Sequence, residues 1–185
     1  MTKWGTLGTL DGQFDTPQGV ATDTSGNVYV ADTFNNRIQK FDASGSFLTT
    51  WGVNGTDNGQ FDAPAAVATD ASGSVYVADI NNNRIQKFDA SGSFLTKWGT
   101  NGTGDGQFDA PAAVATDASG HVYVADVLNS RIQKFDASGT FVTKWGTLGS
   151  LDGQFDSPNG VATDASGHVY VADTANSRVQ KFACP

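Results

Sequence analysis

The chain has 185 residues, of which 38% are hydrophobic and 16% charged, a balance typical of a folded globular protein. All 19 acidic residues are Asp and stand against 11 Lys and Arg; the resulting net charge of -8 argues against nucleic acid or an anionic membrane as main partner. No apolar run approaches the ~18 residues of a membrane helix and no signal peptide is visible, so we expect a soluble chain of undetermined compartment.

Four short segments at the start of the chain predict β-strands. In each, β-branched or aromatic residues alternate with small or polar ones, and turn residues bound the segment. The segments are residues 19–23, 25–32, 37–42 and 46–51. The stretches between the first two and the last two carry Asp first and Gly fourth, which suits tight turns because Asp caps the turn and Gly accepts a positive φ. We therefore predict a four-stranded antiparallel meander.

The same unit recurs at a fixed period. Trp4, Trp51, Trp98 and Trp145 are 47 residues apart, and the chain divides into repeats at about 4–50, 51–97, 98–144 and 145–185. Four strands in every 47 residues are typical of a β-propeller, whereas a β-helix has shorter coils and helical repeats need a 3.6-residue period that is absent. The predicted fold is all-β, a single propeller unit over residues 1–185 with four antiparallel blades.

Residues 17–52, PQGVATDTSGNVYVADTFNNRIQKFDASGSFLTTWG, resemble the NHL-repeat family of propellers, and all four repeats share the pattern. The resemblance covers nearly the whole chain. It implies that 19–23 is the innermost strand of a blade and 46–51 the outermost. It leaves function open, because the family includes protein-binding, RNA-binding and enzymatic members.

The resemblance also implies an offset between the chain ends and the blades. Residues 1–4 match the end of an outermost strand, and the chain ends after a third strand at 178–185. We expect the N-terminal strand to complete the last blade and to hide two strand edges. Family members commonly close with six blades, so four blades favour a homodimer in which two chains pair head to tail in an eight-bladed ring. A single-chain ring of four blades and a fragment of a longer propeller are the alternatives.

Two sets of acidic residues repeat with the blades. In each unit an Asp closes the second strand and an Arg opens the third: Asp32 and Arg37, Asp79 and Arg84, Asp126 and Arg131, Asp173 and Arg178. We interpret them, like the four Trp, as structural, since a site used once does not need four copies; an acid–base ring is the alternative. Asp23, Asp70, Asp117 and Asp164 are predicted turn caps, with a cation site at one opening of the channel as the alternative.

The residues that would indicate catalysis are missing from the pattern. His121 and His168 occupy equivalent turns a whole blade apart and do not make a zinc site, which needs three or more ligands. The Gly-rich stretch 5–12 lacks the Gly-Lys-Ser/Thr of a phosphate loop. Enzymes that the resemblance brings in depend on His or Glu ligands that this sequence does not supply. We therefore expect no catalytic residue, metal or cofactor, and Cys184, the one cysteine, excludes an intrachain disulfide.

The four units differ mainly in connections that a meander places at one end of the blades. These are the stretches before the inner strand and the loops between the second and third strands. The candidate binding residues there are Gln18, Phe34, Asn35, Ile80, Asn81, Val127, Leu128 and Asn159. The sequence favours a non-enzymatic binding or scaffold module that recognises protein, peptide or glycan at this end. An amplified or engineered repeat without a ligand, and an NHL-type metal-dependent lyase or hydrolase, are the alternatives.

Overall fold

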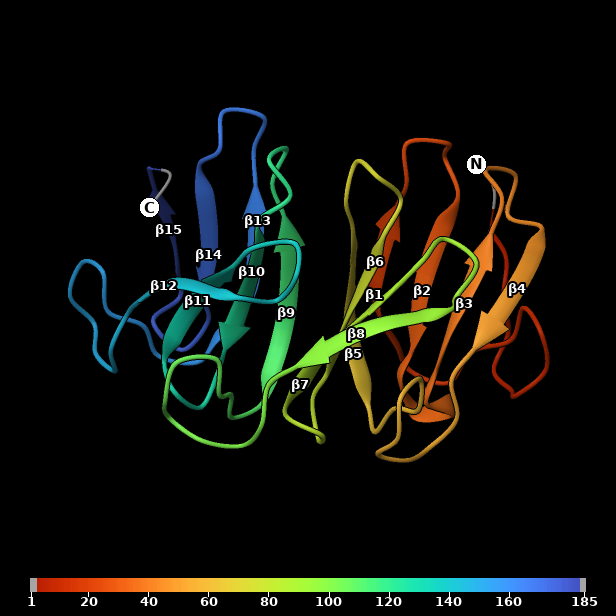
Figure 1. Cartoon of the computed structure of the whole chain (residues 1–185), viewed down its shortest axis with the longest axis horizontal. Coiled ribbons are helices and arrows are strands. Elements are labelled where there is room, and N and C mark those ends of the chain that lie inside the picture. Colours follow the sequence, from red (N-terminus) through yellow and green to blue (C-terminus); the bar gives the residue numbers. More distant parts are fainter. Residues whose placement is uncertain (1–2, 184–185) are drawn as a thin grey trace.

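The computed structural model describes residues 3–183 and contains four antiparallel sheets arranged as the blades of a propeller (Figure 1). The first blade comprises β1 (Pro17–Thr22), β2 (Val28–Asp32), β3 (Arg37–Phe41) and β4 (Phe47–Trp51). The second comprises β5 (Pro64–Thr69), β6 (Val75–Asp79), β7 (Arg84–Phe88) and β8 (Phe94–Trp98). The third comprises β9 (Pro111–Thr116), β10 (Val122–Asp126), β11 (Arg131–Phe135) and β12 (Phe141–Trp145). The fourth comprises β13 (Pro158–Thr163), β14 (Val169–Asp173) and β15 (Arg178–Phe182), so the all-β propeller prediction is confirmed.

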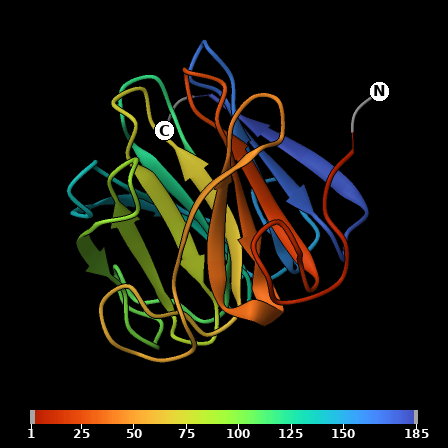
Figure 2. The same ribbon diagram turned by 90° about the vertical axis from the view of Figure 1, so that its right-hand side faces the viewer.

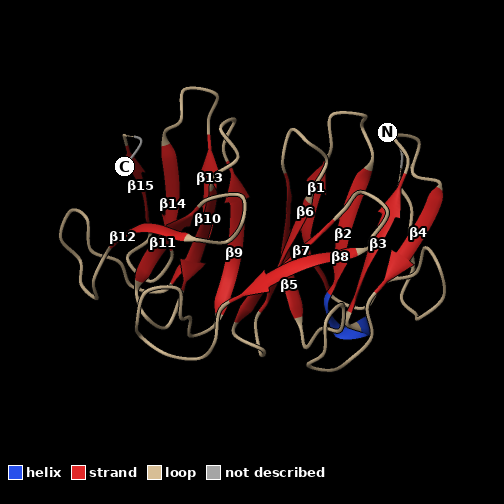
Figure 3. Ribbon diagram, in the orientation of Figure 1, coloured by secondary structure: helices blue, strands red, loops and turns tan. Residues whose placement is uncertain are grey.

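Strands follow one another within each sheet in chain order, as a meander requires. The β2–β3 hairpin pairs Asp32 with Arg37, and this register repeats in every blade. In the first blade the loop of this hairpin forms the short 3-10 helix η1 (Thr33–Asn35), which marks the lower end of the molecule in Figure 3. The residue that closes each of these loops, such as Asn36 with φ 54°, adopts the left-handed conformation that Asn tolerates well.

The hydrophobic core lies between blades rather than inside one sheet. Successive side chains of a strand point to opposite faces, so each blade offers one apolar face to the blade before it and another to the blade after it. Tyr29, Ala31 and Ile38 of the first blade pack against Phe61 and Val75 of the second, and all five are fully buried. The same cluster recurs at the two other contacts between blades, which explains why the strands are almost constant among the repeats.

The expectation that the N-terminal strand completes the last blade is wrong for the part of the chain that the structure describes. The last sheet has three strands, in the order β13-β14-β15. Trp4 belongs to no strand and lies against Phe41 of the first blade, with ring centroids 5.9 Å apart. Figure 2, in which the first sheet faces the viewer, shows the N-terminal segment in red as a loop. Residues 1 and 2 of that predicted strand, like Cys184, lie outside the described residues.

The four blades form an open arc. Inner strands pack in succession, β1 on β5, β5 on β9 and β9 on β13, whereas β1 and β13 do not form a comparable pair. Val20 on β1 is 64% exposed, although the equivalent Val67 and Val114 are 6% and 7% exposed inside the arc. The first and last blades therefore each keep one face free of any other blade.

Among residues 3–183, no helix has the length and apolar character needed to cross a membrane.

Candidate functional site

The Asp and Arg that flank each β2–β3-type hairpin form an ion pair, and its Asp is fully buried in every blade. In the second blade, Arg84 Nε lies 2.7 Å from Asp79 Oδ2, and the two side chains are 6% and 0% exposed. The same 2.7 Å pair is present in the other three blades. The Asp79 carboxylate also accepts hydrogen bonds from the amide of Asp62 and from the side chains of Asn82 and Gln86. A carboxylate with this many donors is positioned for structure, because no lone pair is left to face a substrate.

The arginine of this pair also fixes the loop that enters the blade. Arg84 donates to the carbonyls of Thr56, Asp57 and Gln60, and Gln86 donates to the carbonyl of Gln60. Equivalent bonds hold the other three loops. The variable loops are therefore held by the Asp, Asn, Arg and Gln side chains described above, which are the same in all four repeats. We call this set of side chains the polar frame. Such a frame lets loop side chains change without loss of the fold.

Electrostatics distinguish this frame between blades. Burial raises the pKa of Asp79, and the hydrogen bonds and the Arg84 charge offset only part of that effect. Burial also acts to raise the pKa of Asp173 in the last blade, but its hydrogen bonds from Asp156, Arg178, Asn176 and Gln180 outweigh it and lower the pKa. The last blade has no neighbour on one side, so its carboxylate is less desolvated.

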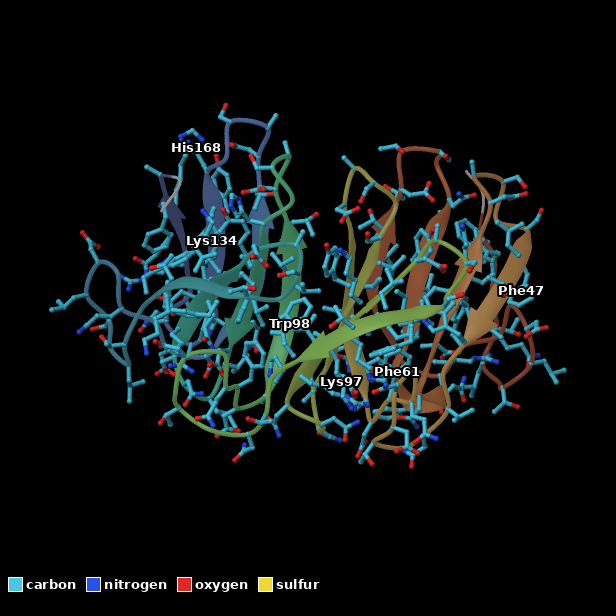
Figure 4. All side chains as sticks on the ribbon, in the orientation of Figure 1. Phe47, Phe61, Lys97, Trp98, Lys134 and His168 are labelled. Carbon is cyan, nitrogen blue, oxygen red and sulfur yellow. The ribbon has the colours of Figure 1, made fainter. Side chains whose placement is uncertain are left out.

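At the opposite end of the blades, an Asp caps each turn between the two innermost strands. In the last blade, Asp164 accepts the amide N–H groups of Ser166 and His168, and its second oxygen accepts the Tyr170 hydroxyl at 3.0 Å. His168 Nδ1 lies 2.9 Å from the same carboxylate, and Figure 4 places this histidine at the upper end of the molecule. Burial acts to raise the pKa of Asp164, but these hydrogen bonds outweigh it and lower the pKa to about 2.

The inner strands of all four blades line a central concavity of about 430 Å³. Its lining consists of Ala, Gly and Val residues, and the polar side chains among them are Gln18 and Asn159. The structure thus brings these two predicted residues to one cavity. Two neutral carboxamides can donate and accept hydrogen bonds, but they supply neither a general base nor a nucleophile. In residues 3–183, no three His, Cys, Asp or Glu side chains gather as a metal-binding group would.

Most of the exposed apolar residues gather at the end of the blades where η1 lies. We call this end the loop face; it comprises residues 5–16, 52–63, 99–110 and 146–157 together with the hairpin loops 33–36, 80–83, 127–130 and 174–177. Its exposed large hydrophobic side chains are Leu7, Leu10, Phe34, Val53, Leu128, Leu148 and Leu151. The other exposed ones in the described chain lie on the outer strands or the free ends of the arc, and none lies in the turns at the opposite end.

The loops of this face touch one another in pairs. Asn35 Nδ2 donates to the Gly8 carbonyl at 2.8 Å and to both Asp32 oxygens, and the amide of Phe34 donates to Asp15. Each hairpin loop is thereby joined to the loop that precedes its own inner strand. Leu7, at 81% exposed, therefore lies on the same joined pair of loops as Phe34.

The structure separates the predicted binding residues into three groups. Phe34, Asn81 and Leu128 are exposed at the tips of equivalent hairpin loops, and Ile80 and Val127 are half-buried beside them. Asn35 is half-buried and its amide is used inside the frame. Gln18 and Asn159 line the central concavity.

The exposed leucines Leu7, Leu10, Leu148 and Leu151 were not singled out by sequence reasoning, although the loops that carry them were. The signal was available, since the equivalent positions of the two middle repeats carry Asn54, Asp57, Asn101 and Gly104. An exposed apolar residue in a loop whose equivalents are polar or glycine is not needed by the repeat itself. It is therefore a candidate for contact with another molecule.

The family assignment follows from a profile match in every repeat. The NHL repeat profile matches residues 14–41, 61–88, 108–135 and 155–182, which together exceed half of the chain. Each match runs from the Phe before the inner strand to the Phe that ends the third strand.

Two curated relatives match over a single repeat length. One is the B-box type zinc finger protein ncl-1 of Caenorhabditis elegans, 51% identical over 45 residues. The other is the protein brain tumor of Drosophila melanogaster, 49% identical over 45 residues. Each match covers 24% of this chain but only 5% or 4% of the relative. The likeness therefore concerns the repeat and not the whole relative.

Solved structures share the fold at low identity. A nidogen/laminin complex matches 95% of this chain and 64% of its own, with a TM-score of 0.72 and 19% identity. A streptogramin B lyase matches 99% of this chain and 58% of its own, with a TM-score of 0.71 and 17% identity. At these identities the comparison establishes the propeller arc and leaves the chemistry of each protein its own.

Proposed function

We propose that this chain, which belongs to the NHL-repeat family, is a non-enzymatic binding module that holds a protein or peptide segment on its loop face. The observation that carries the proposal is the gathering of seven exposed large hydrophobic side chains at this one end of the described blades. Exposed apolar side chains concentrated on one surface are typical of interaction sites, since water contact with them is unfavourable.

Charge narrows the class of partner. Asp11, Asp57, Asp105 and Asp152 are exposed on the same loop face. Asp105 is held by Lys144 at 2.6 Å, whereas Asp57 has no cation within ion-pair distance among the described residues. A segment with alternating basic and apolar side chains fits such a surface, because carboxylates at the rim attract and orient it while leucines bury its apolar groups.

A second partner that we propose is another copy of the chain, in a head-to-tail homodimer that closes an eight-bladed ring. Both end blades keep a free apolar face, on which Val20 and Val179 are 64% and 68% exposed. Burial of such a face against a complementary face favours association. Because the blades are nearly identical, the free face of the last blade is complementary to the free face of the first.

Two other functions have less support. A lyase or hydrolase would need groups that polarise or deprotonate a substrate, and the central concavity offers Gln18 and Asn159 among apolar neighbours. An amplified or engineered repeat without any ligand has no reason to carry leucines in loops whose equivalents in the middle repeats are polar or glycine. The binding module therefore accounts for more of the surface than either alternative.

Selection from a displayed random peptide library tests the loop face. We expect wild-type protein to enrich peptides with basic and apolar residues, and Phe34→Ser with Leu128→Ser to lower their affinity at least tenfold, as loss of two anchors implies. Leu48→Ser with Leu95→Ser is the matched control, because these leucines are similarly apolar and 49% and 52% exposed on outer strands. Enrichment that survives the loop substitutions, or binding to an arrayed glycan instead, would overturn the proposal.

A further inference from the structure

We infer that, in the proposed dimer, each copy completes the last blade of the other, with Lys3 and Trp4 of one copy lying along the free edge of β15 in the other. We call the contact between the last blade of one copy and the first blade of the other the seam. The seam is formed in trans when the two blades belong to different copies, and in cis when they belong to one chain. The inference rests on the self-association proposed above and not on the loop face. It names the residues that would form the contact between a last and a first blade, which does not form within the open arc.

The three contacts between blades within the chain provide the template. Each places Tyr, Ala and Ile of one blade against Val and Phe residues of the next. The last blade ends with the first half of this set, namely Tyr170, Ala172 and Val179. The first blade begins with the second half, namely Phe14, Val20, Val28, Val30 and Phe41. The two ends of one chain thus carry the two halves of a fourth contact.

Each half keeps exposed side chains in the single chain, although Val30 and Phe41 are already buried there. Val179 is 68% exposed, whereas Ile38, Ile85 and Ile132 at the same position are fully buried. On the other end, Val20, Val28, Val30, Phe14, Pro17, Lys3 and Trp4 line an apolar hollow of about 380 Å³. Between the second and third blades, the space equivalent to this hollow is filled by Tyr76 and Ala78 of the preceding blade. Tyr170 and Ala172 of a second copy match that requirement.

Comparison of the ring contacts of the four tryptophans indicates which residues would meet across the seam. Trp51 contacts Tyr29 of its own blade, with centroids 6.2 Å apart, and Phe88 of the next blade, at 5.8 Å. Trp98 and Trp145 make the same two contacts. Trp4 has the Phe contact alone, with Phe41, and Tyr170 has no Trp beside it within the described chain. A pair of Trp4 and Tyr170 from two copies would complete both sets.

A glycine in the turn before the outermost strand of a blade lies against a tryptophan, and on the first blade this tryptophan is Trp4. A Cβ on Gly92 would stand 2.6 Å from the indole of Trp51, and a Cβ on Gly45 would stand 2.7 Å from that of Trp4. Trp4 therefore already occupies, on the first blade, the place taken by the tryptophan of a preceding blade. Residues 3–183 contain no blade before the first one.

Strand register then assigns the pairs across the seam. Within the first blade Ile38 pairs with Trp51 and Gln39 with Thr50. By the same register, Val179 of one copy pairs with Trp4 of the second, and Gln180 pairs with Lys3. The repeated hydroxyl bond extends in the same way: Thr69, Thr116 and Thr163 each donate to the carbonyl of the equivalent Thr one blade earlier, at 2.7–2.8 Å. Thr22 of the second copy would donate to the carbonyl of Thr163.

A second copy suits this role better than the chain's own N-terminus. Trp4 is held on the first blade, and Figure 1 places β15 at the opposite end of the long axis from β4 and the N-terminus. The edge of β15 would otherwise present unpaired backbone groups. Closure in cis would require the arc to bend until β13 meets β1, which would bury Val20.

Light scattering on charged variants tests the head-to-tail contact. We expect wild type to have twice the monomer mass of 19.3 kDa, and Val20→Lys or Val179→Glu alone to be monomeric. An equal mixture of the two variants should return to the dimer mass, because one unaltered seam remains between unlike chains. Leu48→Lys on an outer strand is the control and should stay dimeric. A monomeric wild type, a larger mass, or a mixture that stays monomeric would overturn the inference.

A disulfide distinguishes the trans seam from closure in cis. The variant carries Lys3→Cys and Gln180→Cys together on a Cys184→Ser background. These two positions are chosen because paired residues of antiparallel strands lie ~4.5–5.5 Å apart at Cα, within reach of a disulfide. We expect covalent dimers on a non-reducing gel, and also when the two single variants are mixed. A link within one chain, or no link under oxidation, would exclude the trans strand even if the dimer mass were found. Peptide binding to the loop face is measured separately and does not bear on this result.

Discussion

Asn36 joins the first blade to the second through a single hydrogen bond to Ala63. Its side-chain oxygen accepts the Ala63 amide at 2.9 Å, and Asn83 does the same with Ala110 at 2.9 Å in the next contact. At the third contact Ser130 stands in the place of Asn, and its shorter side chain makes no such bond to Ser157 within the described residues. The repeats are thus unequal at a position that stabilises the contact between blades.

Replacing Ser130 by Asn should therefore stabilise the protein. Ser130 has φ 51°, a left-handed conformation that Asn adopts more readily than Ser, and the new amide oxygen would reach the Ser157 N–H. One added hydrogen bond contributes about 0.5–1.5 kcal/mol, which raises the melting temperature by a few degrees in a chain of this size. Asn83→Ser is the reciprocal control and should lower it by a similar amount. A Ser130→Asn variant that melts no later than wild type would contradict the interpretation.

Gly19 of the innermost strand β1 lies close against the backbone of β5. A Cβ at this position would stand 2.7 Å from the Ala65 carbonyl oxygen and from Ala66 Cα, both of which belong to the backbone of β5. We expect Gly19→Ala to cost about 1–3 kcal/mol of unfolding free energy, because backbone atoms cannot move aside cheaply. Gly160→Ala is the matched control in the last blade, where the nearest atom is the Ala172 methyl group at 3.1 Å. Urea denaturation of the two variants measures the difference, and equal losses would refute the argument.

Much of the fold could be predicted from residue spacing because each repeat solves the same local problem. Tyr29 and Ala31 alternate with Val28 and Val30, so the two buried faces of a blade are visible in the sequence. The position of Trp4 could not be read in the same way. Its sequence matches the end of an outer strand, but which sheet edge it meets depends on whether β13 can approach β1, and that is set by packing angles between blades.

The loop face was predictable only as a region. Variation among repeats located its loops, whereas the half-buried position of Asn35 involves a hydrogen bond to the Gly8 carbonyl, 27 residues away in the chain. Asn35 has a counterpart in every repeat, Asn82 for example, so its constancy already indicated a structural role. The exposed Leu7 and Leu10 needed only a comparison with their polar counterparts.

Removing the buried carboxylate should affect the inner and the last blades unequally. Asp79→Ala leaves the Arg84 guanidinium, 6% exposed, buried without its anion. Loss of one member of a buried pair costs about 3–5 kcal/mol of unfolding free energy. Asp173→Ala is the matched substitution, and it should cost less because Arg178 is 26% exposed and keeps access to water. Thermal unfolding of both variants measures the difference, which should disappear if blade position has no influence on the pair.

Acid should unfold the protein through the turn aspartates. The pKa of Asp164 is lowered to about 2 in the folded state. As the pH falls below the ordinary pKa of Asp, this group therefore binds protons more readily in the unfolded chain than in the folded one. Its contribution to the free energy of unfolding is fully present above the ordinary pKa. It is lost as pH falls from about 4 towards 2, where the folded carboxylate also protonates. The raised pKa of Asp79 acts in the opposite direction, but the lowered ones are more numerous: Asp23, Asp42, Asp70, Asp89, Asp117, Asp136, Asp164 and Asp173. Melting temperature measured from pH 7 to pH 2 should therefore drop below pH 4, and Asp164→Asn should flatten that drop. A steeper drop in the variant would show that another group controls the acid transition.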